Sequence, residues 1–304
     1  MFIKKVFNRI AWERYKYQIR HNPKQFLEEK YLEFAGKPIS WDNPQTLNEK
    51  ILWLICYSDM SEWTRLADKI RVREYVKSKG LDDILIPLLG TWHDANDIDF
   101  DALPQKFVVK CNHDSGSAII VDKTKGFNKR QIINKLNSAL TRPYGYFSVE
   151  PHYIPIDRRI LAEEYIKLDS NGLSSSPIDY KVFCYNGEPD VIWVAYNRHI
   201  GQFCECQTRD LEWNRRKDYE IADKAYRIGD ADIPAPRSLK QMIEAARKLS
   251  TGFPEVRVDF YDVQGKLYFG EMTFTSDSGI ISWFSDKYQI SAGEKIDLNL
   301  AKLR

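Results

Sequence analysis

Apolar residues recur at three- and four-residue spacing through most of residues 1–80, which predicts a mainly helical N-terminal region. Thr46, followed three residues later by Glu49, is typical of a capped helix start. Residues 67–79 predict another helix, which ends at a glycine. The apolar run at residues 84–89 contains a proline, so we expect a short edge segment there and not a central strand.

From residue 103 the pattern changes to short β-rich runs and two helical stretches. We expect strands at residues 106–110, 118–122, 160–168, 180–185, 191–196, 256–261 and 267–274, and helices at residues 129–140 and 238–250. The order has no regular βαβ rhythm and the sequence has no internal repeat, so it predicts an α+β fold. We expect lobe boundaries near residues 95 and 166, which divides the chain into 1–95, 96–166 and 167–304.

One pair of strand-like runs carries the clearest chemical signal. The two runs flank residues 264–266, which predicts a hairpin with a three-residue loop. Pairing the strands about the central glycine places Asp259 opposite Glu271 and Arg257 opposite Thr273. Because side chains alternate along a strand, all four share one face.

Two carboxylates at directly opposite positions repel each other and destabilise a sheet. A Mg²⁺ ion held by Asp259 and Glu271 together with phosphates would offset that repulsion. The alternative is that Arg257 or Lys266 neutralises the pair in an ordinary surface hairpin. Spacing alone leaves both interpretations open.

A second candidate site begins with a lysine at a strand end. Lys110 is followed five residues later by Ser115, Gly116 and Ser117, whose backbone N–H groups can cradle a phosphate. The sequence lacks the Gly-Lys-Ser/Thr of a P-loop. A plain hairpin turn is the alternative.

Composition excludes several classes of protein. The chain has 304 residues with 43% hydrophobic and 29% charged residues, which is typical of a globular protein and excludes disorder. Its longest apolar run, residues 51–57, is too short to span a bilayer, and no signal peptide is evident. Five scattered cysteines fit a reduced cytoplasmic protein. A net charge of +2 argues against a nucleic-acid partner.

Charge is nevertheless concentrated at the N-terminus. Residues 1–24 contain seven lysines and arginines against one acid, Glu13, with apolar residues between them at helical spacing. A basic amphipathic helix of this kind can lie on an anionic membrane surface. The alternative is a helix that packs on its own protein with its cations in solvent.

Taken in order, these segments resemble the TupA-like ATP-grasp family, which is associated with cell-surface polysaccharide synthesis. The resemblance extends from about residue 48 to residue 293. The matching motifs are residues 48–51 (NEKI), 67–69 (ADK), 71–76 (RVREYV), 107–113 (FVVKCNH), 163–166 (EEYI), 179–183 (DYKVF), 257–261 (RVDFY) and 268–274 (YFGEMTF).

The resemblance implies an ATP-grasp fold, in which two α+β lobes clasp ATP behind a helical N-terminal region. Segment 1–95 would then hold the helical region and a short preceding lobe, 96–166 the small lobe with the phosphate loop and hinge, and 167–304 the C-terminal lobe with the metal site. ATP and Mg²⁺ are the implied cofactors.

The resemblance also implies residue roles at the matching positions. Lys110 would hold the α- and β-phosphates, and the loop that closes over the triphosphate would comprise Ser115, Gly116 and Ser117. The backbone that binds adenine would be that of Glu163, Glu164, Tyr165 and Ile166, with Asp169 a candidate for the ribose hydroxyls.

On the metal side, the resemblance makes Asp259 and Glu271 ligands of Mg²⁺. Lys181 would be a second phosphate-side cation, and Arg257 would stabilise charge on the transferring phosphoryl group. The family's usual third metal ligand is Asn, and Thr273 stands in its place here, with a hydroxyl that ligates Mg²⁺ less well.

The implied activity is that of an ATP-dependent carboxylate–amine ligase that works through an acyl phosphate. It would join an amino acid or amine to a uronic-acid-containing surface polysaccharide or its precursor, as in teichuronopeptide-type polymers, in the cytoplasm or at the inner face of the membrane. The alternatives are a sugar phosphotransferase and an inactive nucleotide-binding component of a polysaccharide assembly complex. Residues 276–279, directly after the metal strand, are the candidate acceptor loop, with an ordinary β-turn as the alternative.

Overall fold

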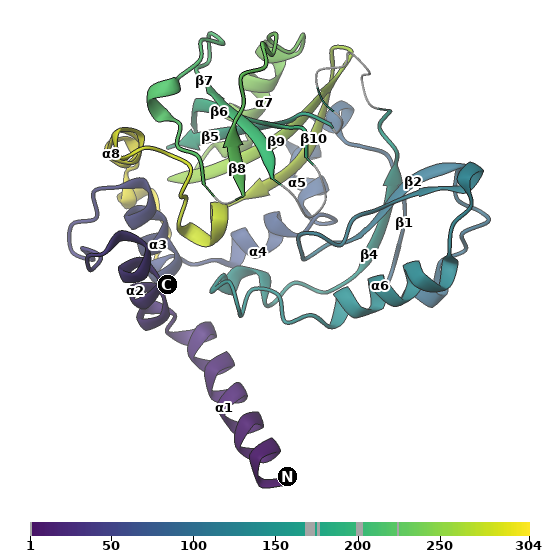
Figure 1. Ribbon diagram of the computed structural model, residues 1–304, viewed down its shortest axis with the longest axis horizontal. Helices are drawn as coiled ribbons and strands as arrows, with labels where there is room; N and C mark the ends of the chain where they lie inside the picture. The colour runs from purple at the N-terminus through teal and green to yellow at the C-terminus, as the bar shows by residue number, and fades with distance from the viewer. Residues whose placement is uncertain (1, 168–173, 175–176, 199–202, 224) are drawn as a thin grey trace.

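The computed structural model describes residues 2–167, 174, 177–198, 203–223 and 225–304, with side chains from residue 11 onward. Two β-sheets lie beside each other, with helices packed against them, and the N-terminal helix extends away from this body (Figure 1). The combination of helices and sheets confirms the expected α+β class.

The smaller sheet is antiparallel and has the strand order β1-β4-β2-β3. Its strands are β1 (Leu88–Trp92), β2 (Lys106–Cys111), β3 (Ile119–Asp122) and β4 (Ile160–Glu164). Helix α6 (Lys129–Thr141) forms with this sheet a hydrophobic core separate from the main one. The strand β1 is at the edge, as predicted, but it begins only after Pro87, and β4 ends earlier than the predicted residue 168. The expected boundary near residue 95 stays a prediction.

The larger sheet has the order β10-β9-β5-β6-β7-β8. Its strands are β5 (Asp179–Tyr185), β6 (Glu188–Tyr196), β7 (Cys204–Arg209), β8 (Tyr226–Ile228), β9 (Glu255–Val263) and β10 (Lys266–Thr273). Helix α7 (Leu239–Ser250) packs on the apolar face, to which β9 contributes Val258 and Phe260. Because side chains alternate, Arg257 and Asp259 project from the opposite face.

The hairpin β9–β10 has the predicted register at the candidate site but not at its turn. Asp259 pairs with Glu271 and Arg257 with Thr273, as expected. The loop, however, has two residues and not three, because Lys266 already pairs with Val263. A bulge between positions 269 and 271 then shifts the register by one residue. The bulge thus compensates for the shorter loop, and the strands have the predicted register at Asp259 and Glu271.

The predicted helix at residues 67–79 is confirmed only for residues 72–78, because a turn separates two helices near its start. Helix α4 (Ser61–Ala67) ends before Asp68, and α5 (Val72–Ser78) begins after Arg71. The carboxylate of Asp68 accepts hydrogen bonds from the backbone N–H groups of Ile70 and Arg71 and from the side-chain amide of Asn112. A tertiary contact therefore breaks a pattern that locally favours a continuous helix.

The remaining α-helices come from the two ends of the chain, and α1 among them extends away from the sheets (Figure 1). They are α1 (Phe2–His21), α2 (Lys24–Ala35), α3 (Leu47–Tyr57) and α8 (Asp286–Lys295). The predicted capping box at Thr46 and Glu49 is confirmed at the start of α3. Within the described part of the chain, no helix combines the length and the apolar character that a bilayer span requires.

Candidate active site

A cluster of charged side chains lies on the open face of the β9–β10 hairpin. The guanidinium of Arg257 holds Asp259 at two points, with Nε 2.6 Å from Oδ1 and Nη2 2.9 Å from Oδ2. Lys181, on the neighbouring strand β5, also donates to Oδ2 of Asp259. Arg257 Nη2 lies 3.5 Å from Glu271 Oε1 and 3.1 Å from the Thr273 hydroxyl. The structure therefore brings together all five predicted residues on these strands.

The members of this cluster differ in their access to water. The side chains of Asp259, Arg257 and Lys181 are 4%, 10% and 11% exposed, whereas that of Glu271 is 38% exposed. Desolvation in the cleft would raise the pKa of Glu271, but nearby cations, Lys69 first among them, lower it to about 2. Desolvation would lower the pKa of Arg257, but the adjacent Asp259 carboxylate raises it above its usual value. Glu271 is thus an ionised carboxylate that stays accessible from the cleft.

The donor set fits a magnesium ion. Asp259 and Glu271 offer carboxylate oxygens from adjacent strands, and Mg²⁺ is usually bound in nucleotide sites by one or two carboxylates plus substrate phosphates. The Thr273 hydroxyl accepts a hydrogen bond from Arg257. In the described residues no group of three or more histidine, cysteine, aspartate and glutamate side chains could hold a metal by itself.

Lys69, which the sequence analysis did not assign to the site, extends the cluster. Its ammonium lies 3.5 Å from Glu271 Oε2 and donates to the backbone carbonyl of Asp114 at 2.9 Å. It thus connects the metal-side carboxylate of the larger lobe with the predicted phosphate loop of the smaller one. Its position in the ADK motif was the signal that could have identified it.

Lys110 lies at the end of β2 and forms an ion pair with Glu163 on β4, with 2.6 Å between Nζ and Oε2. Arg73, another residue that the sequence analysis did not assign, donates to the other carboxylate oxygen of Glu163 at 3.1 Å. Glu163 was expected to act through its backbone. Its buried side chain also positions the phosphate-side lysine.

The loop after Lys110 has an exposed tip and a fixed base. Ser115 and Gly116 are exposed, and Gly116 adopts a positive φ of 87°, which glycine tolerates without strain. The Ser117 hydroxyl is buried, donates to Asp114 and accepts from the backbone N–H of Cys111 at 2.9 Å. The tip is therefore accessible from solvent, while Ser117 holds the loop base in place.

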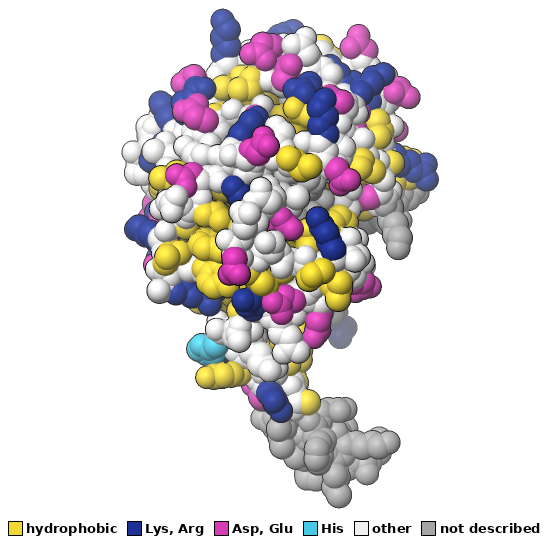
Figure 2. Space-filling view, turned by 90° about the vertical axis from the view of Figure 1, so that its left-hand side faces the viewer, with side chains coloured by type: hydrophobic (Ala, Val, Ile, Leu, Met, Phe, Trp, Pro, Cys, Tyr) yellow, Lys and Arg dark blue, Asp and Glu magenta, His cyan; other side chains and the backbone are white. Residues whose placement is uncertain are grey.

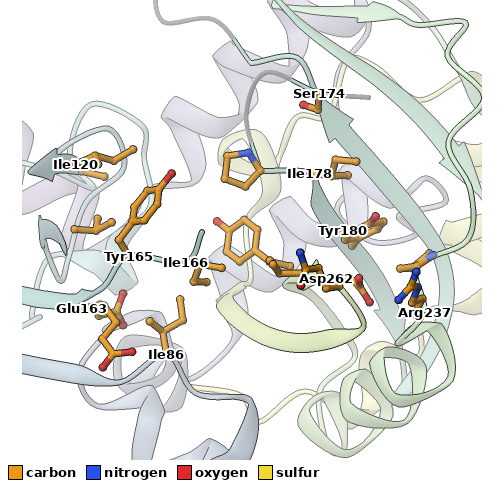
Figure 3. A pocket seen from close by; sticks show the side chains of 18 of the residues that line it. Ile86, Ile120, Glu163, Tyr165, Ile166, Ser174, Ile178, Tyr180, Arg237 and Asp262 are labelled. Carbon is orange, nitrogen blue, oxygen red and sulfur yellow. The ribbon is translucent and has the colours of Figure 1, made fainter. Parts of the chain in front are cut away.

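A pocket of about 470 Å³ lies between the two sheets, next to Lys110. In Figure 3, three residues of the predicted hinge lie on one side of the pocket together with Ile86 and Ile120; they are Glu163, Tyr165 and Ile166. The other side is formed by Ile178, Tyr180 and Asp262. Glu164 also lines it, as do residues 233–237, which the sequence analysis did not assign to the site. Asp169, the predicted ribose ligand, lies outside the described residues.

The walls of this pocket are mainly apolar, with a few charged groups at its ends. A cleft of this size and lining is typical of sites for small organic ligands. Its apolar part suits a flat heteroaromatic base, and Lys110 at one end suits the attached phosphates. The pocket and the charged cluster together can thus accommodate a nucleotide with its phosphates pointing toward Glu271.

The segment after β10 forms the other side of the charged cluster. Asp277, Ser278 and Gly279 all have positive φ values, of 48°, 56° and 81°, and Asp277 is exposed. Consecutive non-glycine residues with a left-handed backbone conformation are strained, and such strain is concentrated at functional sites. The Ser276 hydroxyl lies 3.1 Å from Arg257 Nη1.

Glu150, from the loop before β4, holds this segment in place. The hydroxyls of Thr275 and Ser278 donate to its two carboxylate oxygens. Lys30 of α2 donates to the backbone carbonyl of Ser278 at 3.3 Å. Glu150 is buried, and this burial raises the pKa of its carboxyl group. The local sequence offered no signal for this role.

Comparison with known proteins identifies the family. The model of the TupA-like ATP-grasp family matches residues 49–297. No curated protein matches. Among solved structures, D-alanine–D-alanine ligase from Bacillus anthracis is 19% identical with a TM-score of 0.41, covering 72% of this chain and 60% of that one. The Helicobacter pylori enzyme is 14% identical with a TM-score of 0.42, covering 78% of this chain and 62% of that one.

A third solved structure is that of the ATP-grasp ligase PsnB, complexed with a phosphomimetic variant of its minimal precursor, Mg and ADP. It is 10% identical with a TM-score of 0.41, and the match covers 82% of this chain and 62% of the PsnB chain. The chain thus spans about three-fifths of the length of these structures. Family membership rests on the family match, which includes every described residue of the charged cluster and of the pocket. The chain belongs to the TupA-like ATP-grasp family.

Proposed function

We propose that the protein is an ATP-dependent carboxylate–amine ligase that acts through an acyl phosphate. The observation that carries this proposal is the position of Lys69, Lys181 and Arg257 around the Asp259–Glu271 pair, next to a pocket that suits a nucleotide. Three cationic side chains surround two carboxylates, so the cluster has a net positive charge that can bind a polyphosphate. Preorganised charge of this kind is the main catalytic resource in phosphoryl transfer.

The proposed chemistry has two steps. A carboxylate oxygen of the acceptor sugar attacks the γ-phosphorus of ATP, the bond to the bridging oxygen breaks, and ADP leaves. The amine nitrogen then attacks the acyl carbon, loses a proton and expels inorganic phosphate, which leaves an amide. Phosphorylation is needed because a free carboxylate repels nucleophiles and has no adequate leaving group.

The side chains of the cluster have separate roles in this scheme. Lys110 and Lys69 bind the phosphates, and Lys181 neutralises the transferring group. Arg257 stabilises the charge that develops on the phosphoryl oxygens and on the carboxylate. Asp259 and Glu271 would hold Mg²⁺, which supplies additional neutralisation of phosphate charge when it is bound.

We further propose that the acid belongs to a uronic-acid-containing surface polysaccharide or its precursor, and that the amine is an amino acid or another small amine. The resemblance to polysaccharide-associated members of the family supports this substrate class. ATP is a cytoplasmic substrate, so the proposed site of action is the cytoplasm, at the inner face of the membrane.

Product analysis tests the proposal. The protein is incubated with ATP, Mg²⁺, uronic acids in free and nucleotide-linked form and a panel of amino acids, and the products are identified by mass spectrometry. We expect an amide, ADP and phosphate in equal amounts, all absent from the Glu271→Gln variant. A stable phosphosugar would indicate the phosphotransferase alternative. ATP binding without turnover over the whole panel would indicate a nucleotide-binding component.

A further inference from the structure

The N-terminal helix is a separate feature of the molecule. Helix α1 extends away from the body (Figure 1), and it precedes residue 49, where the family match begins. Residues 1–24 contain seven lysines and arginines and one acid, and the rest of the chain has 38 basic against 42 acidic residues. On the face seen in Figure 2, the body shows both charge signs interspersed. The excess of lysine and arginine over acidic residues is therefore concentrated near the N-terminus and does not extend over the rest of the protein.

One side of α1 is attached to the body. The ring of Trp12 stacks on Phe147 with centroids 5.2 Å apart, and the Tyr15 hydroxyl donates to the carbonyl of Tyr146 at 2.9 Å. Ile19 is fully buried. These three helix positions are separated by three, four and seven residues, so they form one face. The helix is thus held on the protein by this face.

On the opposite side of α1 the Arg20 guanidinium lies 5.5 Å from the centre of the Tyr146 ring, whereas Tyr17 is open to solvent. Tyr17 is 65% exposed, and two positions separate it from the buried Ile19, which places the two residues about 200° apart on a helix of 3.6 residues per turn. The same repeat places positions 3 and 10, both isoleucine, within about 40° of Tyr17. The apolar positions of the first ten residues are therefore in phase with the free side and not with the docked one.

Exposed charge accompanies this free side. Arg14 and Arg20 are both exposed, and each is three residues from Tyr17, so they lie on either side of it. In the described chain the two most exposed large hydrophobic side chains are Phe147, at 71%, and Tyr17. Both belong to this end of the molecule.

We infer that the free side of α1 binds an anionic lipid surface. Apolar positions in phase along a helix, an interfacial tyrosine and flanking arginines match a helix that lies at the headgroup boundary. Six lysines and arginines against one acid on α1 supply the charge complementarity to acidic headgroups. This contact would hold the ligase at the membrane, where lipid-linked polysaccharide precursors are built. That consequence rests on the proposed ligase activity, whereas lipid binding itself does not.

Vesicle sedimentation tests the inference without ATP, amine or sugar, so its failure would leave the ligase proposal untouched. The full chain is mixed with phosphatidylcholine vesicles that contain or lack phosphatidylglycerol, at low and at high salt. We expect binding to the acidic vesicles alone, and weaker binding at high salt. Each basic residue near an acidic surface contributes about fivefold in affinity, so the Arg9→Ala/Arg14→Ala variant, which removes cations that flank the free side, should bind about 25-fold more weakly.

Two further variants separate the apolar contribution from general charge effects. Ile3→Asn/Ile10→Asn, which changes no charge, should abolish binding, whereas Lys125→Ala/Arg130→Ala, which removes two exposed cations from the smaller lobe, should bind like the wild type. Thermal melting checks that all variants are folded. Equal binding to neutral vesicles, no binding to acidic ones, or unchanged binding by the α1 variants would overturn the inference. So would a dimer that Ile3→Asn/Ile10→Asn dissociates, since a second copy would then cover this side.

Discussion

Replacing Asp259 with Asn separates two roles of that carboxylate. As a metal ligand alone, Asp259 would matter for turnover and little for the fold. In the structure it is also the shared partner of Arg257 and Lys181, and all three side chains are almost completely removed from water. The Asp259→Asn variant keeps the shape of the side chain but leaves two buried cations without their counter-charge.

The expected loss of stability follows from these contacts. Removing one partner from a buried ion pair typically costs about 3–5 kcal/mol, because the other charge is left uncompensated. An asparagine oxygen still accepts one hydrogen bond from Arg257, so we expect the lower end, about 3 kcal/mol. With an unfolding entropy of about 2.1 cal/mol/K per residue, a chain of 304 residues should melt roughly 5 °C lower.

The Glu271→Gln variant is the matched control. Glu271 is more than one-third exposed, and its contacts with Lys69 and Arg257 are both 3.5 Å long. Partly exposed pairs of this length contribute less than about 1 kcal/mol to stability, so its melting temperature should change by no more than 1–2 °C. Both variants should lose ATP turnover.

Calorimetric melting of both proteins without nucleotide gives the comparison. A Tm for Asp259→Asn equal to that of the wild type would refute the view that Asp259 is the buried counter-ion of the cluster. Equal destabilisation by the two variants would show instead that Glu271 is as deeply involved in the ion pairs as Asp259.

Three further predictions concern the nucleotide, the acceptor and the pH dependence of folding. Lys110→Ala should weaken ATP binding about tenfold to a hundredfold, because a charge-assisted phosphate contact is lost, and unchanged affinity in titration calorimetry would make Lys110 a purely structural partner of Glu163. Asp277→Ala and Ser278→Ala should raise the KM for the acceptor or lower kcat at unchanged ATP affinity, whereas wild-type acceptor kinetics would assign this segment to structure alone. Burial lowers the pKa of His152 from 6.5 to about 3. Between these pH values the unfolded chain binds a proton at His152 that the folded chain does not, so the free energy of unfolding should decrease as the pH falls from 6.5 toward 3. Both ring nitrogens of His152 lack hydrogen-bond partners, so His152→Phe should leave stability at neutral pH within about 1 kcal/mol and reduce its dependence on pH, and an unchanged pH profile of Tm would contradict this explanation.

Strand alternation predicted correctly which residues of each strand share a face, namely Arg257 with Asp259 on β9 and Glu271 with Thr273 on β10. The two pairs share one face of the hairpin only because the bulge in β10 offsets the shorter turn. The turn itself was not predicted correctly. Its length depends on the positive φ of residue 264 and on a bulge at residue 270, and neither follows from hydrophobic pattern.

Other features depended on contacts between distant parts of the chain. The break between α4 and α5 requires Asn112 to approach Asp68, and the role of Glu150 requires Thr275 to lie next to it. Periodicity describes an element and not its neighbours, so neither contact could be read from it. The Asp259–Glu271 pair also shows that two interpretations left open by spacing are compatible, since Arg257 neutralises Asp259 while Glu271 remains accessible to a cation.

The most direct test of the central claim follows a carboxylate oxygen. The uronic acid is labelled with ¹⁸O in its carboxylate, the ligase reaction is run with ATP and amine, and the released phosphate is analysed by mass spectrometry. An acyl phosphate requires one labelled oxygen to leave with phosphate when the amide forms, so we expect one ¹⁸O atom per phosphate. Amide formation with unlabelled phosphate, or with the label in AMP, would contradict the mechanism.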